Sequence, residues 1–293
     1  MVAKAVAAYT NVVRDYILLT KPGIVMLVLI TALTGMYLAK RGFPDSWLIF
    51  WSLLGTGLAS AGSAVLNQFF DRDIDAVMSR TKNRPIPSGS VSSVNALLFG
   101  VILLTLSLYI MLAFVNPVAT FFTVMASFFY VVVYTLALKR RSPLATEIGG
   151  ISGALPPVIG YTSVTGQFGI EPLILFLIMF VWQPPHFWVL AVKYAEDYRK
   201  AGVPTLPVVK GIFQTKVRTL LYTAALFPIS LLPTLYGITG KIYFFTAFAL
   251  SLVYLILTLR FFFSKSSRGM SLFFYSIIYL ALLFSVMVFD MVR

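Results

Sequence analysis

The stretch NQFFDRDIDAVMSRTKNRP, residues 67–85, follows directly on a long run of apolar and small residues. Its first half places Asn67, Asp71 and Asp75 four residues apart, so a helix would present them within about 80° of one another. An amide oxygen and two carboxylates stacked on one face suit a hard divalent cation such as Mg²⁺. Charged groups at the edge of hydrocarbon are costly. We therefore interpret these three residues as metal ligands, with Asp71 and Asp75 catalytic, rather than as ordinary loop charges.

The second half of the same stretch supplies positive charge. Arg80 and Arg84 follow the last carboxylate within nine residues. Guanidinium groups make bidentate hydrogen bonds to phosphate, so the two arginines could hold the anion that such a cation accompanies. The stretch as a whole predicts a site for a metal diphosphate at a membrane surface.

Composition identifies the class of protein. The chain is 59% hydrophobic and 11% charged, whereas soluble domains carry about 25% charged residues. The mean hydropathy is +0.90, which predicts a polytopic membrane protein. The chain has no cysteine, which excludes disulfide frameworks and thiol nucleophiles. It has a single histidine, which excludes multi-histidine metal centres. The net charge of +13 is explained by the loops described below, and we expect no nucleic-acid partner.

Nine segments are apolar and long enough to span a bilayer, which takes about 20 residues. They predict an all-α bundle of nine transmembrane helices that forms one domain over residues 1–293. The second is rich in glycine, alanine and serine and should pack inside the bundle. The fifth contains Pro156 and Pro157 and should be kinked or broken. The nine segments are residues 22–39, 46–69, 92–113, 117–138, 144–164, 171–193, 217–238, 241–262 and 270–291.

The basic residues divide unevenly between the two sides of this bundle. All but four of the 23 lysines and arginines fall on one side; the exceptions are Lys40, Arg41, Lys241 and Arg293. This bias predicts a cytoplasmic N-terminus in a multi-pass protein of the cell membrane. The two long loops, residues 70–91 and 194–216, lie on the same side and place the active site at the cytoplasmic face. Lys21, just before the first span, is interpreted as an interfacial anchor.

A second group of donors ends the fourth span. Tyr134, Lys139 and Arg140 lie on the same expected membrane face as the acidic stretch. Basic residues there often do no more than set topology. Two donor clusters on one face favour a substrate-binding role.

A third group surrounds the only histidine. His186 lies in the segment WQPPHFW, residues 182–188, after an expected proline break. A general base, a haem-iron ligand and an orienting donor are all open roles for it. Lys193 and Asp197 follow, the first as a substrate contact and the second as a further metal contact, direct or through water.

These motifs together resemble the UbiA superfamily of intramembrane prenyltransferases, in particular its haem-farnesylating branch. The superfamily pattern N-x3-D-x3-D is similar to Asn67–Asp75, and the branch extension D-x2-M-x-R-T-x2-R-P is similar to Asp75–Pro85. A second aspartate-rich motif found in most members is replaced here by His186 and Glu196-Asp197, as in that branch. Further similar patterns are Y-T-x3-K-R at Tyr134–Arg140, W-Q-x-P-H-F-W at Trp182–Trp188, D-Y at Asp197-Tyr198 and L-P-V-V at Leu206–Val209.

The resemblance implies a reaction and its partners. The farnesyl chain of farnesyl diphosphate would be transferred to a vinyl group of haem B, with addition of water, to form haem O. Mg²⁺ would be the cofactor, haem B a substrate, and the lipid bilayer the surroundings of both substrates. His186 would serve the haem acceptor. A partnership with haem A synthase or with terminal oxidase assembly is left open.

Three rival functions are compatible with a polytopic membrane protein. The nearest is a prenyltransferase of the same fold with another acceptor, such as a quinone precursor or a lipid alcohol; the segment at 182–188 argues against it. A transporter could use the acidic helix as an ion site, but alternating access needs polar access from both faces, and the long polar loops lie on one. A structural assembly subunit does not explain carboxylates in helical register.

Overall fold

The computed structural model describes residues 12–264 and 269–292, and in that part of the chain eight helices are long and apolar enough to cross a membrane. The expected all-α membrane bundle is confirmed. Four basic residues of the charge count, Lys4, Lys265, Arg268 and Arg293, lie outside the described residues. The eight helices are α2 (Pro22–Lys40), α3 (Ser46–Phe70), α5 (Ser93–Phe114), α6 (Pro117–Phe128) continued by the π-helix η1 (Phe129–Leu138), α9 (Ile170–Lys193), α12 (Gly211–Leu235), α13 (Lys241–Phe263) and α14 (Met270–Phe289).

The fifth expected span is broken into two short helices. α7 (Ala145–Ala154) and α8 (Pro156–Thr165) are separated by a single residue, Leu155. Pro156 and Pro157 have no backbone N–H and therefore cannot continue the hydrogen bonding of α7. Proline is well tolerated in the first turn of a helix, and these two prolines begin α8. Over the described residues, the nine expected spans are therefore eight full-length helices and one broken pair.

The proline pair before His186 behaves differently. The expected break is wrong, because α9 runs without interruption through Pro184 and Pro185. Both prolines are buried. In a membrane bundle, neighbouring helices support a helix across the missing hydrogen bonds, and α9 is packed by α7, α12 and α14.

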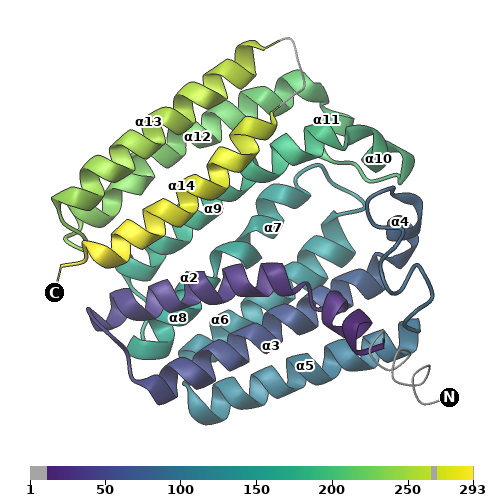
Figure 1. Ribbon diagram of the computed structural model, residues 1–293, viewed down its shortest axis with the longest axis horizontal. Coiled ribbons are helices and arrows are strands. Elements are labelled where there is room, and N and C mark those ends of the chain that lie inside the picture. Colours follow the sequence, from purple (N-terminus) through teal and green to yellow (C-terminus); the bar gives the residue numbers. More distant parts are fainter. Residues whose placement is uncertain (1–11, 265–268, 293) are drawn as a thin grey trace, which may run out of the picture.

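The helices form two groups with α7 between them (Figure 1). One group contains α9, α12, α13 and α14, and the largest hydrophobic cluster lies here, around the fully buried Tyr243 and Tyr279. The other contains α2, α3, α5, α6 and α8. The prediction that α3 packs through small residues is confirmed: a Cβ on Gly62 would lie 2.9 Å from the Gly100 oxygen of α5.

The short helices gather at one end of the bundle. α4 (Arg72–Val77), α10 (Ala195–Lys200) and α11 (Leu206–Val209) occupy the two long loops and lie together there (Figure 1). Ile74 and Met78 pack against Val203, so the two loops cover each other. We call this the acidic end, because it carries Asp71, Asp73 and Asp75.

At the opposite end, one ion pair fastens several elements. Arg41, which caps α2 in a left-handed conformation (φ 57°), contacts Glu171 Oε1 at 2.6 Å and donates to the Ile238 carbonyl at 3.1 Å. The Tyr161 hydroxyl donates to Glu171 Oε2 at 2.8 Å. This opposite-end clamp, made of Arg41, Tyr161 and Glu171, joins α2, α8, α9 and the α12–α13 connection.

Candidate active site

The acidic stretch forms a helix junction that keeps its register. α3 ends at Phe70 and α4 begins at Arg72, so Asp71 is the residue between them. The Asp71 N–H still donates to the Asn67 carbonyl (3.0 Å), and the Asp75 N–H donates to the Asp71 carbonyl (2.8 Å). Asn67, Asp71 and Asp75 are all buried, at 3%, 0% and 2% exposure.

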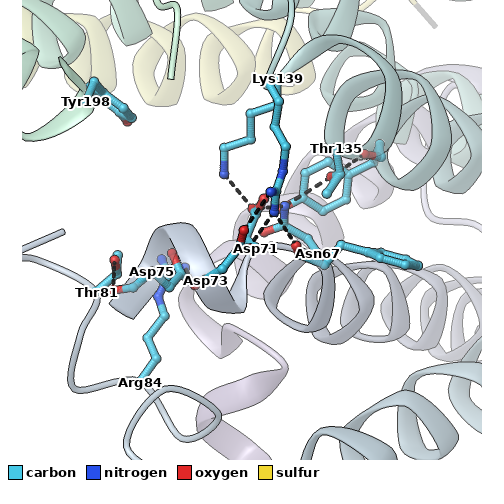
Figure 2. Close-up of polar contacts among 12 residues, drawn as sticks. Asn67, Asp71, Asp73, Asp75, Thr81, Arg84, Thr135, Lys139 and Tyr198 are labelled. Atoms are coloured by element: carbon cyan, nitrogen blue, oxygen red, sulfur yellow. Dashed lines mark hydrogen bonds and ion pairs between the residues drawn. The ribbon is translucent and has the colours of Figure 1, made fainter. Parts of the chain in front are cut away.

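Asp71 is held on one side only. Its Oδ2 accepts from Asn67 Nδ2 at 2.7 Å and from Lys139 Nζ at 2.5 Å, and Asn67 Nδ2 also donates to Thr135 Oγ1 at 3.0 Å. Figure 2 shows Lys139 reaching down onto Asp71. The other oxygen, Oδ1, is buried without a hydrogen-bond partner. A buried carboxylate oxygen left without a partner is costly, so this atom is a natural ligand for a cation.

Asp75 is held from the opposite direction. Arg84 Nη1 contacts Asp75 Oδ2 at 2.6 Å, and Thr81 Oγ1 donates to the Asp75 carbonyl at 3.0 Å. Figure 2 shows Arg84 approaching on the far side of α4 from Lys139. The structure therefore brings Arg84 and Lys139, both expected at the diphosphate, onto the two carboxylates.

Lys21 is a site residue that the sequence interpretation missed. Its Nζ donates to Asn67 Oδ1 at 2.7 Å and to the Tyr130 hydroxyl at 3.2 Å. Burial, together with the positive charges of Arg84 and Lys139, lowers the pKa of Lys21 to about 7. A lysine before a first span looks like an anchor, and only the fold brings it to α3.

The charges of this site do not balance. Arg84 and Lys139 pair with Asp75 and Asp71, and Lys21 adds a third basic group whose positive charge is only partial at neutral pH, because its pKa is about 7. The surplus positive charge favours an additional anion. No group of three acidic or histidine side chains in the described residues forms a ready metal centre. Mg²⁺ commonly takes one or two carboxylates and completes its shell with phosphate oxygens and water. The donor set therefore fits a metal that arrives with a diphosphate.

Arg140 is not in this group. It makes a bidentate pair with Asp73, at 2.6 and 2.7 Å, and Nη2 also donates to the Phe70 carbonyl at 2.6 Å. These hydrogen bonds lower the pKa of Asp73 to about 2. In this arrangement Arg140 is engaged by Asp73, and its expected contact with diphosphate stays a prediction. Arg140 caps the end of α3 and braces the junction, because orphan carbonyls at a helix C-terminus attract basic side chains.

Tyr134 lies beside the site. Its ring stacks on Tyr130 with centroids 5.9 Å apart, and Lys139 Nζ lies 6.0 Å from the ring centroid. A Cβ on Gly149 would lie 2.5 Å from the Tyr134 ring, so this glycine lets α7 approach closely. Tyr134 is placed to support Lys139.

Three other expected residues lie on, or just before, the loops that cover the acidic end; Lys193 is the last residue of α9. Arg80 and Lys193 face one ring, that of Tyr194, at 5.4 and 5.3 Å from its centroid. Asp197 accepts a hydrogen bond from Ser79. Within the described chain, none of the three makes a hydrogen bond or ion pair with Asn67, Asp71 or Asp75, and the second metal contact expected of Asp197 stays a prediction. Its carboxylate instead fastens one loop to the other.

His186 belongs to a separate aromatic group. Its ring lies between Trp182, with centroids 4.7 Å apart at 19°, and Phe273 of α14, at 4.5 Å and 22°. Nδ1 lies 2.7 Å from Ser276 Oγ. Sequence reasoning missed Phe273 and Ser276, because α14 carries no charged or motif residue near them.

Comparison with known proteins agrees with this geometry. Residues 28–285 match the model of the UbiA prenyltransferase family. A protein from Aquifex aeolicus named protoheme IX farnesyltransferase is 58% identical over 99% of this chain and 100% of its own length. One of the same name from Neorickettsia sennetsu is 43% identical over 95% of this chain and 92% of its own.

Two solved structures share the fold. A structure of digeranylgeranylglyceryl phosphate synthase has a TM-score of 0.82 at 20% identity and covers 96% of this chain and 98% of its own. A UbiA homologue from Archaeoglobus fulgidus bound to DMAPP and Mg²⁺ has a TM-score of 0.67 at 19% identity. The match covers 93% of this chain and 99% of that chain. At these identities the likeness concerns the fold alone.

Proposed function

The chain belongs to the UbiA prenyltransferase family, and from this premise we propose that it transfers the farnesyl group of farnesyl diphosphate to a vinyl group of haem B, forming haem O. The full-length likeness to protoheme IX farnesyltransferases carries this proposal. The acidic end supports the diphosphate half of the reaction, since it offers a buried oxygen without a partner and a surplus of cations.

At the acidic end, each residue has a role in the departure of diphosphate. Asn67, Asp71 and Asp75 hold Mg²⁺, which neutralises charge on the leaving group when bound. Lys21, Arg84 and Lys139 donate to the diphosphate oxygens and exchange part of their present contacts for them. Arg80, on a covering loop, and Lys193, at the end of α9, hold the outer edge of the substrates.

The reaction itself needs a dry apolar surround. The C1–O bond of the farnesyl group breaks and its electron pair leaves with diphosphate. The vinyl π electrons form the new carbon–carbon bond, and the carbon next to the macrocycle takes up a water oxygen as a proton is released. Aromatic faces stabilise the allylic cation, and exclusion of water from C1 prevents its hydrolysis. His186, between Trp182 and Phe273, belongs to the acceptor side.

The setting follows from the substrates and the charge distribution. Both substrates are lipophilic, so they reach the bundle from the bilayer. The excess of basic residues at the acidic end supports a position of this site on the cytoplasmic face of the cell membrane. Haem A synthase or a terminal oxidase under assembly is the class of partner that receives the product.

Mass spectrometry of extracted haem tests the function. The purified protein is incubated with haem B, farnesyl diphosphate and Mg²⁺, beside an Asp71→Ala variant and a chelator control. We expect a hydroxyethylfarnesyl haem only with intact Asp71 and metal. Diphosphate release without modified haem would mean hydrolysis to farnesol, and the assay would then be repeated with a quinone precursor and with a lipid alcohol as acceptor. No consumption of farnesyl diphosphate with any acceptor would contradict a prenyltransferase.

A further inference from the structure

His186 is held in one orientation by aromatic rings on both faces. Trp182 lies one helical turn before it on α9, and Phe273 covers the other face from α14. Both rings are nearly parallel to the imidazole, at 19° and 22°. Because both faces are covered, only the edge of the imidazole, with its two nitrogens, can meet another group.

One of these two nitrogens is already engaged. Ser276 Oγ lies 2.7 Å from His186 Nδ1 and 2.6 Å from the Phe273 carbonyl oxygen. A carbonyl oxygen can only accept, so the single hydroxyl hydrogen of Ser276 is directed to Phe273. Toward His186 the same oxygen then accepts, which places the hydrogen of a neutral imidazole on Nδ1. Nε2 keeps the lone pair.

Ser276 is itself fixed by the same cluster. Trp182 Nε1 donates a hydrogen bond to the Ser276 carbonyl at 2.9 Å. Trp182 therefore both covers His186 and links α9 to the backbone of α14. His186 is only partly buried, whereas Ser276 is fully buried. The arrangement therefore has a rigid inner side at Nδ1 and an accessible outer edge.

The structure assigns to Ser276 the role of a positioning residue that holds His186 in the Nδ1–H tautomer, so that Nε2 ligates the iron of the haem acceptor. This inference rests on the proposed function and adds how the acceptor is held. A neutral imidazole nitrogen is a common axial ligand of haem iron. A hydrogen bond to the other nitrogen orients such a ligand and raises its basicity, and loss of such an outer partner typically costs 10–100-fold in metal affinity.

The test separates iron ligation from binding of the macrocycle. Full-length protein in lipid nanodiscs is titrated with haem B and, in parallel, with metal-free protoporphyrin IX. Resonance Raman spectra of the ferrous haem complex report the iron–histidine bond directly. The variants are Ser276→Ala, Ser276→Thr, which keeps a hydroxyl, and His186→Ala.

We expect Ser276→Ala to weaken haem B binding about 10-fold and to shift the iron–histidine signal, with protoporphyrin binding unchanged. Ser276→Thr should restore both properties, and His186→Ala should abolish the signal. Ser230→Ala is the matched control, because Ser230 Oγ also donates to the carbonyl three residues earlier, at 2.8 Å, and bonds another buried side chain. It should change neither haem property.

Two outcomes would overturn the inference. Wild-type haem affinity and an unshifted signal in Ser276→Ala would remove Ser276 from this role, even if the wild type makes haem O. An iron–histidine signal that survives in His186→Ala would exclude His186 as the ligand. Because His186 is the only histidine of the chain, the signal would then come from a purification tag or a contaminating protein. Farnesyl diphosphate binding without any haem binding in the wild type would reject the proposed acceptor itself.

Discussion

The two ends of the bundle each carry a carboxylate paired with a basic residue, but the two carboxylates differ in burial and in how many of their oxygens have hydrogen-bond partners. At the opposite-end clamp, both oxygens of Glu171 have partners, Arg41 and Tyr161, and the Glu171 side chain is 25% exposed. At the acidic end, Asp71 is fully buried, one of its oxygens has no partner, and cations outnumber carboxylates. A satisfied pair fastens helices, whereas a buried unsatisfied one is set up for a ligand.

The sharpest way to break this comparison is to change Asp71. Asp71→Asn should lower turnover about 10³-fold, because it removes the negative charge and leaves one amide oxygen to serve both Lys139 and the metal. Release of diphosphate from farnesyl diphosphate, measured with and without Mg²⁺, checks this. The double variant Asp71→Asn with Lys139→Met removes the unpaired lysine as well and should recover thermal stability but not turnover. Recovery of turnover would mean that Asp71 is structural, like Glu171.

Lys139 should come next in effect. Lys139→Met should lower turnover about 100-fold and raise the KM for farnesyl diphosphate, since one donor to the developing charge is lost. Steady-state kinetics over a range of farnesyl diphosphate concentrations measure both. Lys82→Met, which changes an exposed lysine in the loop after α4, is the control. Equal kinetics in the two variants would contradict a role for Lys139 at the diphosphate.

The acidic end also shows how far local sequence carries the prediction. The spacing of Asn67, Asp71 and Asp75 is a property of one helix, and the structure keeps it across the junction. Lys21 and Lys139 reach the same cluster from 46 and 68 residues away. Periodicity contains no information on such pairings. Lys21 therefore looked like an anchor, and Arg140 looked equivalent to Lys139.

The two proline pairs make the same point for the backbone. Pro156 and Pro157 start a new helix, while Pro184 and Pro185 lie inside an unbroken one. The local dipeptide is the same, so the difference arises from packing: α9 is enclosed by three helices that support it. Bundle class, span positions and the shared helical face of Asn67, Asp71 and Asp75 were predictable, since each depends on hydropathy or helical period. Ser276, on an apolar helix 90 residues from His186, was not.

At the other end of the comparison, Glu171→Gln should affect stability rather than chemistry. It weakens the pair with Arg41 and should lower the free energy of unfolding by about 1–3 kcal/mol, as for hydrogen bonds to charged groups. Turnover below the melting temperature should stay within about twofold of wild type. Thermal unfolding in detergent and haem O formation at a low temperature check the two parts. A large loss of turnover in folded protein would show that the clamp communicates with the acidic end.

Arg140→Gln should have the smallest effect. The pair with Asp73 is largely exposed, with side chains 40% and 62% accessible, and exposed pairs contribute about 0–1 kcal/mol. Its hydrogen bond to the Phe70 carbonyl braces the junction before Asp71, so turnover should fall by no more than about threefold. Steady-state kinetics at low and high salt measure this. Salt screens the exposed pair in the wild type, so the difference in turnover between wild type and variant should become smaller at high salt. A loss comparable to that of Lys139→Met would instead return Arg140 to the diphosphate site.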